Sequence, residues 1–413
     1  MSSAVLKPVN GESISSLKNE SSRAIASNYV DMIPRKCCAL SLQHDLEPLF
    51  TLPSFPVSMY CVDTLPETDI FADMEWSISR GSGCVQLAKL APLDVVYGHE
   101  HGSGAVGGVW RDHHSAFANF LNKHGVRRAL EIGAGHGVLA KQYLEHYQDA
   151  SWVVVEPNLP AWAHERVLMI KGMFGSDFTL PDGVPSVDAV VHSHTFEHMY
   201  EPRAFLEDVN KFLPEGAMHV FTLPRMGSWL KQHHPNTLNF EHTILLTENA
   251  IEELLRVTGF EIVEKQCFRN DHSVFYATRK VAAFSQLAAL RLNEFTTNKK
   301  MFMDFVTAQQ EAVSRINTAL AQVPGKAYLF GAHIFSQITL GFGLHVDRIA
   351  GIIDNDASKH GKRLYGTNLI VSGPEVLSTV EHPVVVLRVG SYRREIMDGI
   401  VKCISPRRVI FLE

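Results

Sequence analysis

Three glycines at alternate positions follow a carboxylate in the stretch Arg-Ala-Leu-Glu-Ile-Gly-Ala-Gly-His-Gly. Glu131 closes a short apolar run, the glycines are Gly133, Gly135 and Gly137, and the helix-forming segment 138–147 comes next. Glycine lets the backbone approach a ligand closely, and the first N–H groups of a helix have no partner within it. The stretch therefore predicts a strand, a tight turn and a helix start that together bind a small ligand.

The spacing of the glycines separates two kinds of cofactor loop. A dinucleotide fingerprint reads G-x-G-x-x-G, whereas this chain reads E-x-G-x-G-x-G. The pattern resembles the S-adenosylmethionine (SAM) loop of class I methyltransferases. The resemblance implies that SAM contacts Glu131, Gly133, Ala134, Gly135 and Gly137. A nicotinamide-dependent dehydrogenase is the main alternative, and the glycine spacing disfavours it.

Three later strand ends should complete the cofactor site. The apolar run 151–155 ends in Glu156-Pro157, about 20 residues beyond the glycines, where a carboxylate can accept hydrogen bonds from ribose hydroxyls. A third strand leads to Met173 and Phe174, which we expect beside the adenine. A fourth leads to Ser193 and His194 at the carboxyl edge of the sheet, where open parallel sheets bind ligands.

Imidazoles beside carboxylates mark the substrate side. In Asn239-Phe-Glu241-His242 the histidine is a candidate general base and the glutamate its partner, with a helix-entry glutamate and a solvated histidine as the alternative. His194 is a further candidate catalytic residue. Glu197 and His198 follow it closely, and the alternative to a functional role is that they begin the next helix.

The glycine-rich loop after Tyr97 holds His99 and His101 on either side of a glutamate. A metal site and a polar substrate loop are both consistent with it. We favour the substrate loop, because no further metal ligands lie at suitable spacing. No metal-binding residues are therefore predicted.

Alternating apolar and helical segments place these residues in an α/β fold with a mostly parallel sheet. We expect a flexible tail over 1–30 and a strand-rich N-terminal substrate lobe over 31–110. A cofactor-binding Rossmann-like domain should cover 111–280, a helical linker 281–325 and a second Rossmann-like domain 326–413. The linker segment 281–322 reads as one or two long helices.

Composition excludes several classes of protein. The net charge of −6 without a basic tract argues against a nucleic-acid partner. The polar start of the chain lacks an apolar signal region, and no apolar run is long enough to span a membrane, so we expect a cytoplasmic protein. The six cysteines form no C-x-x-C pair and should be reduced thiols.

Taken together, these stretches resemble one family, the three-domain nucleotide-sugar C-methyltransferases, over about 31–413. The most specific of them lie in the C-terminal domain, at Gly331-Ala-His333, Asp354-Asn-Asp356 and 361–366. The resemblance implies that a nucleotide-linked keto-sugar is deprotonated beside its carbonyl and that the resulting enolate attacks the methyl group of SAM. The notable departures from the family pattern lie in the N-terminal lobe.

Roles for individual residues follow from that resemblance. It implies that His242, oriented by Glu241, is the base and that His99 or His101 stabilises the oxyanion. Two alternatives remain open. One is O-methylation by an enzyme of the same fold, and the other is a non-catalytic relative that binds sugar nucleotides.

The family usually carries one zinc ion on two C-x-x-C pairs in the N-terminal lobe. Here the first pair would fall around Cys37/Cys38 and Leu40/Ser41, and the second at Ser79 and Ser82, with Cys84 out of register. We therefore predict that zinc is absent, and that packing or association into a homodimer stabilises the lobe.

The C-terminal domain is a candidate site for the nucleotide of the substrate. Lys359, Lys362 and Arg363 are the residues that would lie near its phosphates. The alternative is a scaffold that closes over the active site.

Overall fold

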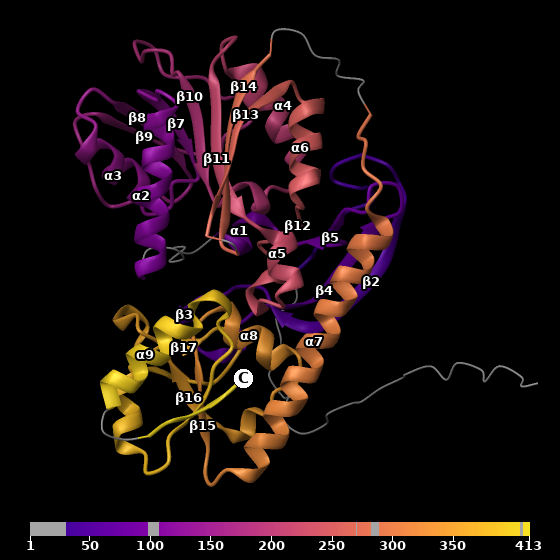
Figure 1. The fold of residues 1–413 in the computed structure, drawn as a ribbon, viewed down its shortest axis with the longest axis vertical. Helices are drawn as coiled ribbons and strands as arrows, with labels where there is room; N and C mark the ends of the chain where they lie inside the picture. The colour runs from indigo at the N-terminus through magenta and orange to yellow at the C-terminus, as the bar shows by residue number, and fades with distance from the viewer. Residues whose placement is uncertain (1–29, 98–106, 270, 282–288, 405–407) are drawn as a thin grey trace, which may run out of the picture.

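The computed structural model describes residues 30–97, 107–269, 271–281, 289–404 and 408–413. These residues form three larger sheets and two two-stranded pairs, and one long helix runs along one side (Figure 1). Among the described residues, no helix combines the length and the apolar character needed to cross a membrane.

The central sheet has seven strands, ordered β13-β14-β11-β10-β7-β8-β9. The first five in the chain are parallel, β14 is antiparallel to its neighbours β11 and β13, and β13 at the edge runs in the same direction as the first five. The strands are β7 (Arg128–Ile132), β8 (Ser151–Glu156), β9 (Val167–Lys171), β10 (Ala189–Ser193), β11 (Met218–Pro224), β13 (Phe260–Phe268) and β14 (Ser273–Lys280). The predicted α/β class with a mostly parallel central sheet is confirmed.

Helices cover both faces of this sheet, because its strands are apolar on both sides. One buried cluster packs α4 (Pro202–Phe212) and α6 (Glu248–Val257) on one face, and a second packs α2 (Gly108–Lys123) and α3 (Val138–His146) on the other. Each helix begins within a few residues of the position that the sequence indicates. The glycine loop therefore lies at the carboxyl edge of the sheet, between β7 and α3.

The N-terminal lobe is an antiparallel sheet in the order β12-β5-β4-β2. Its strands are β2 (Leu46–Pro56), β4 (Phe71–Ser79), β5 (Val85–Leu87) and β12 (Ile244–Leu245). The fourth strand comes from the segment that follows His242, so the loop of the candidate base is anchored to the lobe. A separate pair joins β1 (Ile33–Pro34) to β6 (Lys89–Leu90), and α1 (Leu93–Val96) follows.

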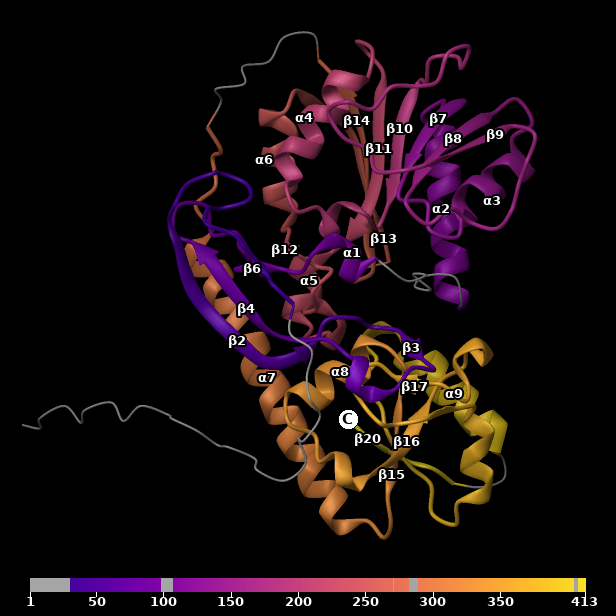
Figure 2. The ribbon, with the colours of Figure 1, turned by 180° about the vertical axis from the view of Figure 1, so that it is seen from behind.

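The long helix α7 (Phe295–Gln322) runs beside β2 and β4 (Figure 2). Helix had been expected from about residue 281, but 289–294 is not helical. Leu290 and Leu292 from this stretch pack against the core of the central sheet, and that packing overrides their helical propensity. The short α5 (Met226–Lys231) lies against the same helix.

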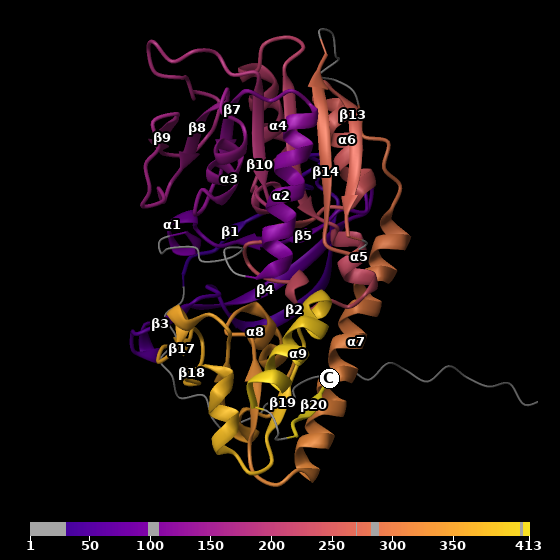
Figure 3. The ribbon, with the colours of Figure 1, turned by 60° about the vertical axis from the view of Figure 1, so that its left-hand side comes forward.

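The C-terminal sheet is parallel, in the order β18-β16-β15-β19-β20. Its strands and helices are β15 (Ala327–Phe330), α8 (Ile334–Gly341), β16 (Ile349–Ile353), β18 (Val371–Ser372), β19 (Val384–Val386), α9 (Arg393–Ile404) and β20 (Ile410–Leu412). The N-terminal lobe also pairs with this part of the chain, through β3 (Cys61–Val62) and β17 (Arg363–Leu364) (Figure 3).

Candidate functional site

The glycine loop has the backbone that its sequence demands. Gly133, Gly135 and Gly137 have φ angles of 70°, 51° and 66°, in the left-handed region that disfavours other residues. A Cβ atom on Gly137 would lie 2.4 Å from the indole nitrogen of Trp162, and one on Gly133 would lie 2.8 Å from Thr195. A Cβ atom on Gly135 would meet no atom within 4 Å. The loop thus holds bare main chain beside open space, which fits a cofactor.

The carboxylate of Glu156 lies against this loop. Its oxygens accept hydrogen bonds from the backbone N–H groups of Gly135, at 3.1 Å, and Asn158, at 2.9 Å. The side chain ends β8 with Pro157 directly after it. This is the position expected for an acid that binds ribose hydroxyls.

Glu131 lies inside the sheet. The indole N–H of Trp152 donates to its carboxyl at 2.7 Å, and burial raises the pKa of Glu131 to about 7. The predicted contact of Glu131 with SAM would place a carboxylate near the positive sulfonium. A pKa near neutrality makes that charge partial, and a nearby cation would increase it.

The chain beyond β10 turns sharply at His194, whose φ is 51°. His194 Nε2 lies 2.9 Å from the Ser273 hydroxyl, and its Nδ1 lies 3.4 Å from a carboxylate oxygen of Glu197. Burial lowers the pKa of His194 to about 3, so the ring is neutral and a weak base. Ser193 ends the strand, and its carbonyl accepts a hydrogen bond from the Thr195 hydroxyl.

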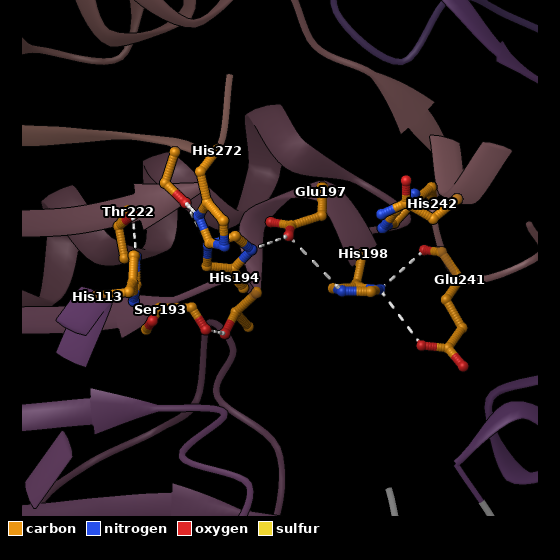
Figure 4. Close-up of polar contacts among 12 residues, drawn as sticks. His113, Ser193, His194, Glu197, His198, Thr222, Glu241, His242 and His272 are labelled. Carbon is orange, nitrogen blue, oxygen red and sulfur yellow. Dashed lines mark hydrogen bonds and ion pairs between the residues drawn. The ribbon is translucent and has the colours of Figure 1, made fainter. Parts of the chain in front are cut away.

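Glu197 is the centre of a buried polar cluster (Figure 4). The short 3-10 helix Phe196–His198 holds it, with 1% of its surface exposed. One carboxylate oxygen lies near both His194 and His198, and the other is buried without a hydrogen-bond partner. His198 in turn lies 3.1 Å from the carbonyl and 3.9 Å from the carboxylate of Glu241.

His242 completes the cluster. Its ring centre lies 5.3 Å from that of His198. Its Nδ1 lies 2.9 Å from the carbonyl of Thr237 and 3.0 Å from the Asn239 amide nitrogen. Thr237 and Asn239 thus contact this ring, and the expectation that Glu241 orients it stays a prediction. Glu241 lies beside His198, because Asn239 Oδ1 accepts the backbone N–H groups of both residues 241 and 242 and so turns the loop.

Residues 106–265 match a family model described as a methyltransferase domain. The chain contains a class I SAM-dependent methyltransferase domain. The match covers the glycine loop, Glu156 and the whole Glu197 cluster. A comparison with curated proteins found no match.

A comparison with solved structures found methyltransferases of low overall similarity. The chain is similar to the 1,6-didemethyltoxoflavin-N1-methyltransferase of Burkholderia thailandensis, with 20% identity and a TM-score of 0.33, over 42% of this chain and 81% of that one. It is similar to the N-methyltransferase NodS of Bradyrhizobium japonicum WM9, with 14% identity and a TM-score of 0.33, over 44% and 92%. It is also similar to human N-acetylserotonin methyltransferase, with 18% identity and a TM-score of 0.35, over 42% of this chain and 53% of that one. These likenesses leave the substrate open.

Two predicted cofactor contacts follow β9. Phe174 packs its ring against Phe178, Phe205 and Phe212 beside α4. Met173 is 60% exposed. Their contacts with the adenine stay predictions. The predicted His99 and His101 lie outside the described residues.

The N-terminal lobe brings together the positions that would form the zinc site, and these residues do not fit the ion. Cys38 Sγ lies 3.3 Å from the Ser82 hydroxyl, and Ser79 donates instead to the carboxylate of Asp45 at 3.0 Å. Cys84 adds a second buried thiol, whose Sγ lies 3.7 Å from the side-chain oxygen of Gln86. Two thiols and two hydroxyls are not a practical zinc set, because zinc sites are built from thiolate, imidazole and carboxylate ligands.

The basic residues of the C-terminal domain have other partners than phosphate. Arg363 is buried and forms an ion pair with Asp69 of the N-terminal lobe, at 2.6 Å. Lys359 lies 3.1 Å from Asp354, whose carboxylate also accepts the backbone N–H of Ala332. The buried ion pair gives Arg363 a structural role. The phosphate contacts of Lys359 and Lys362 stay predictions.

Several residues of the site were missed by reasoning from sequence. Glu197 was noted but left out of the catalytic set, and Thr237, Asn239, Ser273 and His272 were not singled out. Only Asn239 carried a local signal, because asparagine readily accepts the backbone N–H groups that follow it in a turn. The others reach the site through tertiary packing.

Proposed function

We propose that the chain transfers the methyl group of SAM to a small molecule that a buried base first deprotonates. The observation that carries this proposal is the gathering of Glu197, His198, Glu241 and His242 at the sheet edge that also holds the glycine loop. Thr195 connects the two regions, since it lies directly over Gly133 and is two residues from Glu197.

In this proposal the glycine loop and Glu156 hold SAM, which supplies an electrophilic methyl group when bound. His242 accepts the substrate proton. The carbonyl of Thr237 is an acceptor only and favours a proton on Nδ1, while the Asn239 amide nitrogen competes for the same atom as a donor. With the proton on Nδ1, the lone pair lies on Nε2. Burial lowers the pKa of His242, and Glu197 opposes that shift and stabilises the imidazolium that forms.

The nucleophile is proposed to be the carbon beside the carbonyl of a nucleotide-linked keto-sugar, as the family resemblance implies. Carbon attacks a methyl group only after deprotonation, so a base is essential. Holding the two reactants in line can contribute about 7–11 kcal/mol of the barrier reduction. O-methylation needs the same base, and it is the second candidate. A chain that binds sugar nucleotides without catalysis is the third.

The test is incubation with SAM and a panel of nucleotide-linked keto-sugars, with products analysed for the mass gain of one methyl group. NMR of the product then separates C-methylation from O-methylation. Calorimetry with SAM separates all of these from a non-catalytic relative that does not bind SAM. The result that contradicts the proposal is SAM binding without methyl transfer to any member of the panel.

The role of His242 needs a matched pair of variants. His242→Ala should retain SAM binding and lose turnover by about 100-fold or more, which is the usual contribution of a general base. His345→Ala, at an exposed position in the C-terminal domain, should behave as the unmodified protein. Unchanged turnover in His242→Ala would refute the assignment of the base.

A further inference from the structure

The C-terminal domain reaches the methyltransferase site through a tyrosine. Tyr392 lies in the 3-10 helix Gly390–Tyr392, and its hydroxyl is 3.3 Å from Nε2 of His272. Gly390 makes this approach possible. It has a φ of 54°, and a Cβ atom there would lie 3.2 Å from the ring of His234. Contacts this close bring the C-terminal domain against the turn that precedes β14.

From His272 a chain of polar contacts continues to the buried carboxylate of Glu197. Nδ1 of His272 lies 2.6 Å from the Ser273 hydroxyl, and the same hydroxyl lies 2.9 Å from Nε2 of His194. Nδ1 of His194 then lies 3.4 Å from the Glu197 carboxylate. Figure 4 shows His272, His194 and Glu197 in this order. Three elements far apart in the sequence are thus joined by one polar path.

The Glu197 end of this path fixes the direction of every proton in it. A carboxylate only accepts, so it favours an N–H on the facing nitrogen of His194, and Nε2 of His194 then accepts from Ser273. The serine in turn accepts from Nδ1 of His272, so Nε2 of His272 carries the lone pair. The Tyr392 hydroxyl, which can donate or accept, meets that lone pair as a donor.

The interior of the path then has one consistent arrangement. Burial lowers the pKa of both His194 and His272 to about 3, so each ring is neutral and carries one N–H and one lone pair. His272 accepts from Tyr392 at Nε2 and donates from Nδ1 to Ser273. The serine donates to Nε2 of His194, which presents its Nδ1–H to Glu197.

We propose that the C-terminal domain positions the active-site carboxylate through this path, with Tyr392 holding both histidines in the Nδ1–H tautomer. The positioning role rests on the proposed function, because it needs Glu197 to act in catalysis, whereas the tautomers do not. An N–H aimed at Glu197 holds one oxygen and leaves the other for the interior of the cluster. His272, Ser273 and His194 are in this view positioning residues.

A transition-metal ion is the competing occupant of the same histidines. One ring nitrogen from each of His113, His194 and His272 lies within 4.8 Å of the others, and Nδ1 of His113 is buried without a hydrogen-bond partner. An ion would need a lone pair from each ring. The single lone pairs of His194 and His272 already accept hydrogen bonds from Ser273 and Tyr392, so the observations favour the proton path.

The test is ¹⁵N NMR of protein labelled on histidine, which distinguishes the two neutral tautomers without any substrate. Both His194 and His272 should be Nδ1–H, although free imidazole prefers the other form. Tyr392→Phe removes the donor to His272, and should shift the Nε2 signal of His272 and then that of His194. Tyr365→Phe is the matched control, because its hydroxyl contacts the backbone of Ile70 and not the histidines.

Three results would overturn the proposal. They are an Nε2–H tautomer in either ring, unchanged signals in Tyr392→Phe, and a bound transition metal that His113→Ala releases. Ser273→Ala interrupts the path at a second point. It should shift the ¹⁵N signals of both His194 and His272, and it keeps the test available if Tyr392→Phe folds poorly. Once a methyl acceptor is known, Tyr392→Phe should lower kcat more than it changes KM. Failure to find an acceptor affects the proposed function and leaves the tautomers testable.

Discussion

The imidazoles of His192 and His219 face each other across β10 and β11, with their Nε2 atoms 2.9 Å apart. Both side chains are fully buried, and aromatic rings, including that of Phe221, surround them. A hydrogen bond between two ring nitrogens needs an N–H on one ring and a lone pair on the other, so the two rings cannot both be charged. Burial lowers the pKa of His219 to about 3 and that of His192 well below its ordinary value.

This pair predicts a loss of stability in acid. The unfolded chain binds protons on both histidines near pH 6.5 and the folded chain does not, so the unfolded state binds more protons between about pH 3 and pH 6.5. The free energy of unfolding should therefore fall as the pH is lowered through that window, by at most about 1.4 kcal/mol per pH unit for each histidine.

Urea unfolding at pH 7.5 and pH 5 checks this prediction. The double variant His192→Leu/His219→Leu should lose less stability between the two values than the unmodified protein. His345→Gln, at an exposed position, should lose as much as the unmodified protein. An equal loss in the double variant and the unmodified protein would show that the pair does not bind protons on unfolding.

Glu131 predicts the opposite dependence on pH. Its pKa is raised from 4.5 to about 7 in the folded chain, so the folded state binds more protons between those values. Stability from this group therefore falls as the pH rises from 4.5 to 7. Glu131→Gln keeps an acceptor for Trp152 and removes the charge. Its gain in stability over the unmodified protein should therefore be larger at pH 8 than at pH 5, by on the order of 2 kcal/mol.

Unfolding free energies of the variant and the unmodified protein at those two pH values provide the measurement. Glu145→Gln, on the exposed side of α3, is the control and should show no such difference. A gain that is the same at both pH values would mean that Glu131 is ionised throughout the range.

Much of the methyltransferase fold was predictable because its signals are local. The apolar run before Glu131, the glycines after it and the helix that follows each carry their own propensity, and the structure forms them within a few residues. The long-range arrangement was not predictable in this way. Three features are set by tertiary contacts that override local preference: the pairing of β12 with the N-terminal lobe, the packing of Phe174 beside α4, and the non-helical stretch 289–294.

In the candidate site, too, some residues are placed by local sequence and others by tertiary contacts. Glu156 lies where strand order and spacing place it. The partner of each histidine, by contrast, depends on which turns meet at the sheet edge. Glu241 precedes His242 in sequence yet contacts His198, and His272 meets a tyrosine 120 residues later.

The glycine loop predicts a selective loss of cofactor binding. Gly137→Ala places a Cβ atom on a backbone of positive φ and against Trp162, so Trp162 or the loop must move. Calorimetry should show a large loss of SAM affinity. Gly325→Ala has the same sign of φ, with no atom within 4 Å of its Cβ, and lies just before β15. It should cost about 1–2 kcal/mol of stability and leave SAM affinity unchanged. Equal affinities in the two variants would remove the loop from the cofactor site.

The ion pair between Arg363 and Asp69 predicts how firmly the N-terminal lobe is held to the C-terminal domain. Both guanidinium nitrogens bond the carboxylate, at 2.6 Å and 2.8 Å, and the aspartate is 1% exposed. Arg363→Ala leaves that charge buried without its partner, which typically costs about 3–5 kcal/mol. Lys362→Ala, one residue earlier, should change stability by less than about 0.5 kcal/mol.

Denaturant unfolding of the two variants tests the pair, and a phosphate-binding role would give a different pattern. If Arg363 bound the substrate nucleotide, Arg363→Ala would weaken nucleotide-sugar binding at unchanged stability. The buried ion pair instead predicts a large loss of stability, because the Asp69 carboxylate also accepts the backbone N–H of Gly366 and cannot follow a missing partner into solvent. Restoring stability with the second substitution Asp69→Asn would identify the uncompensated charge as the cause.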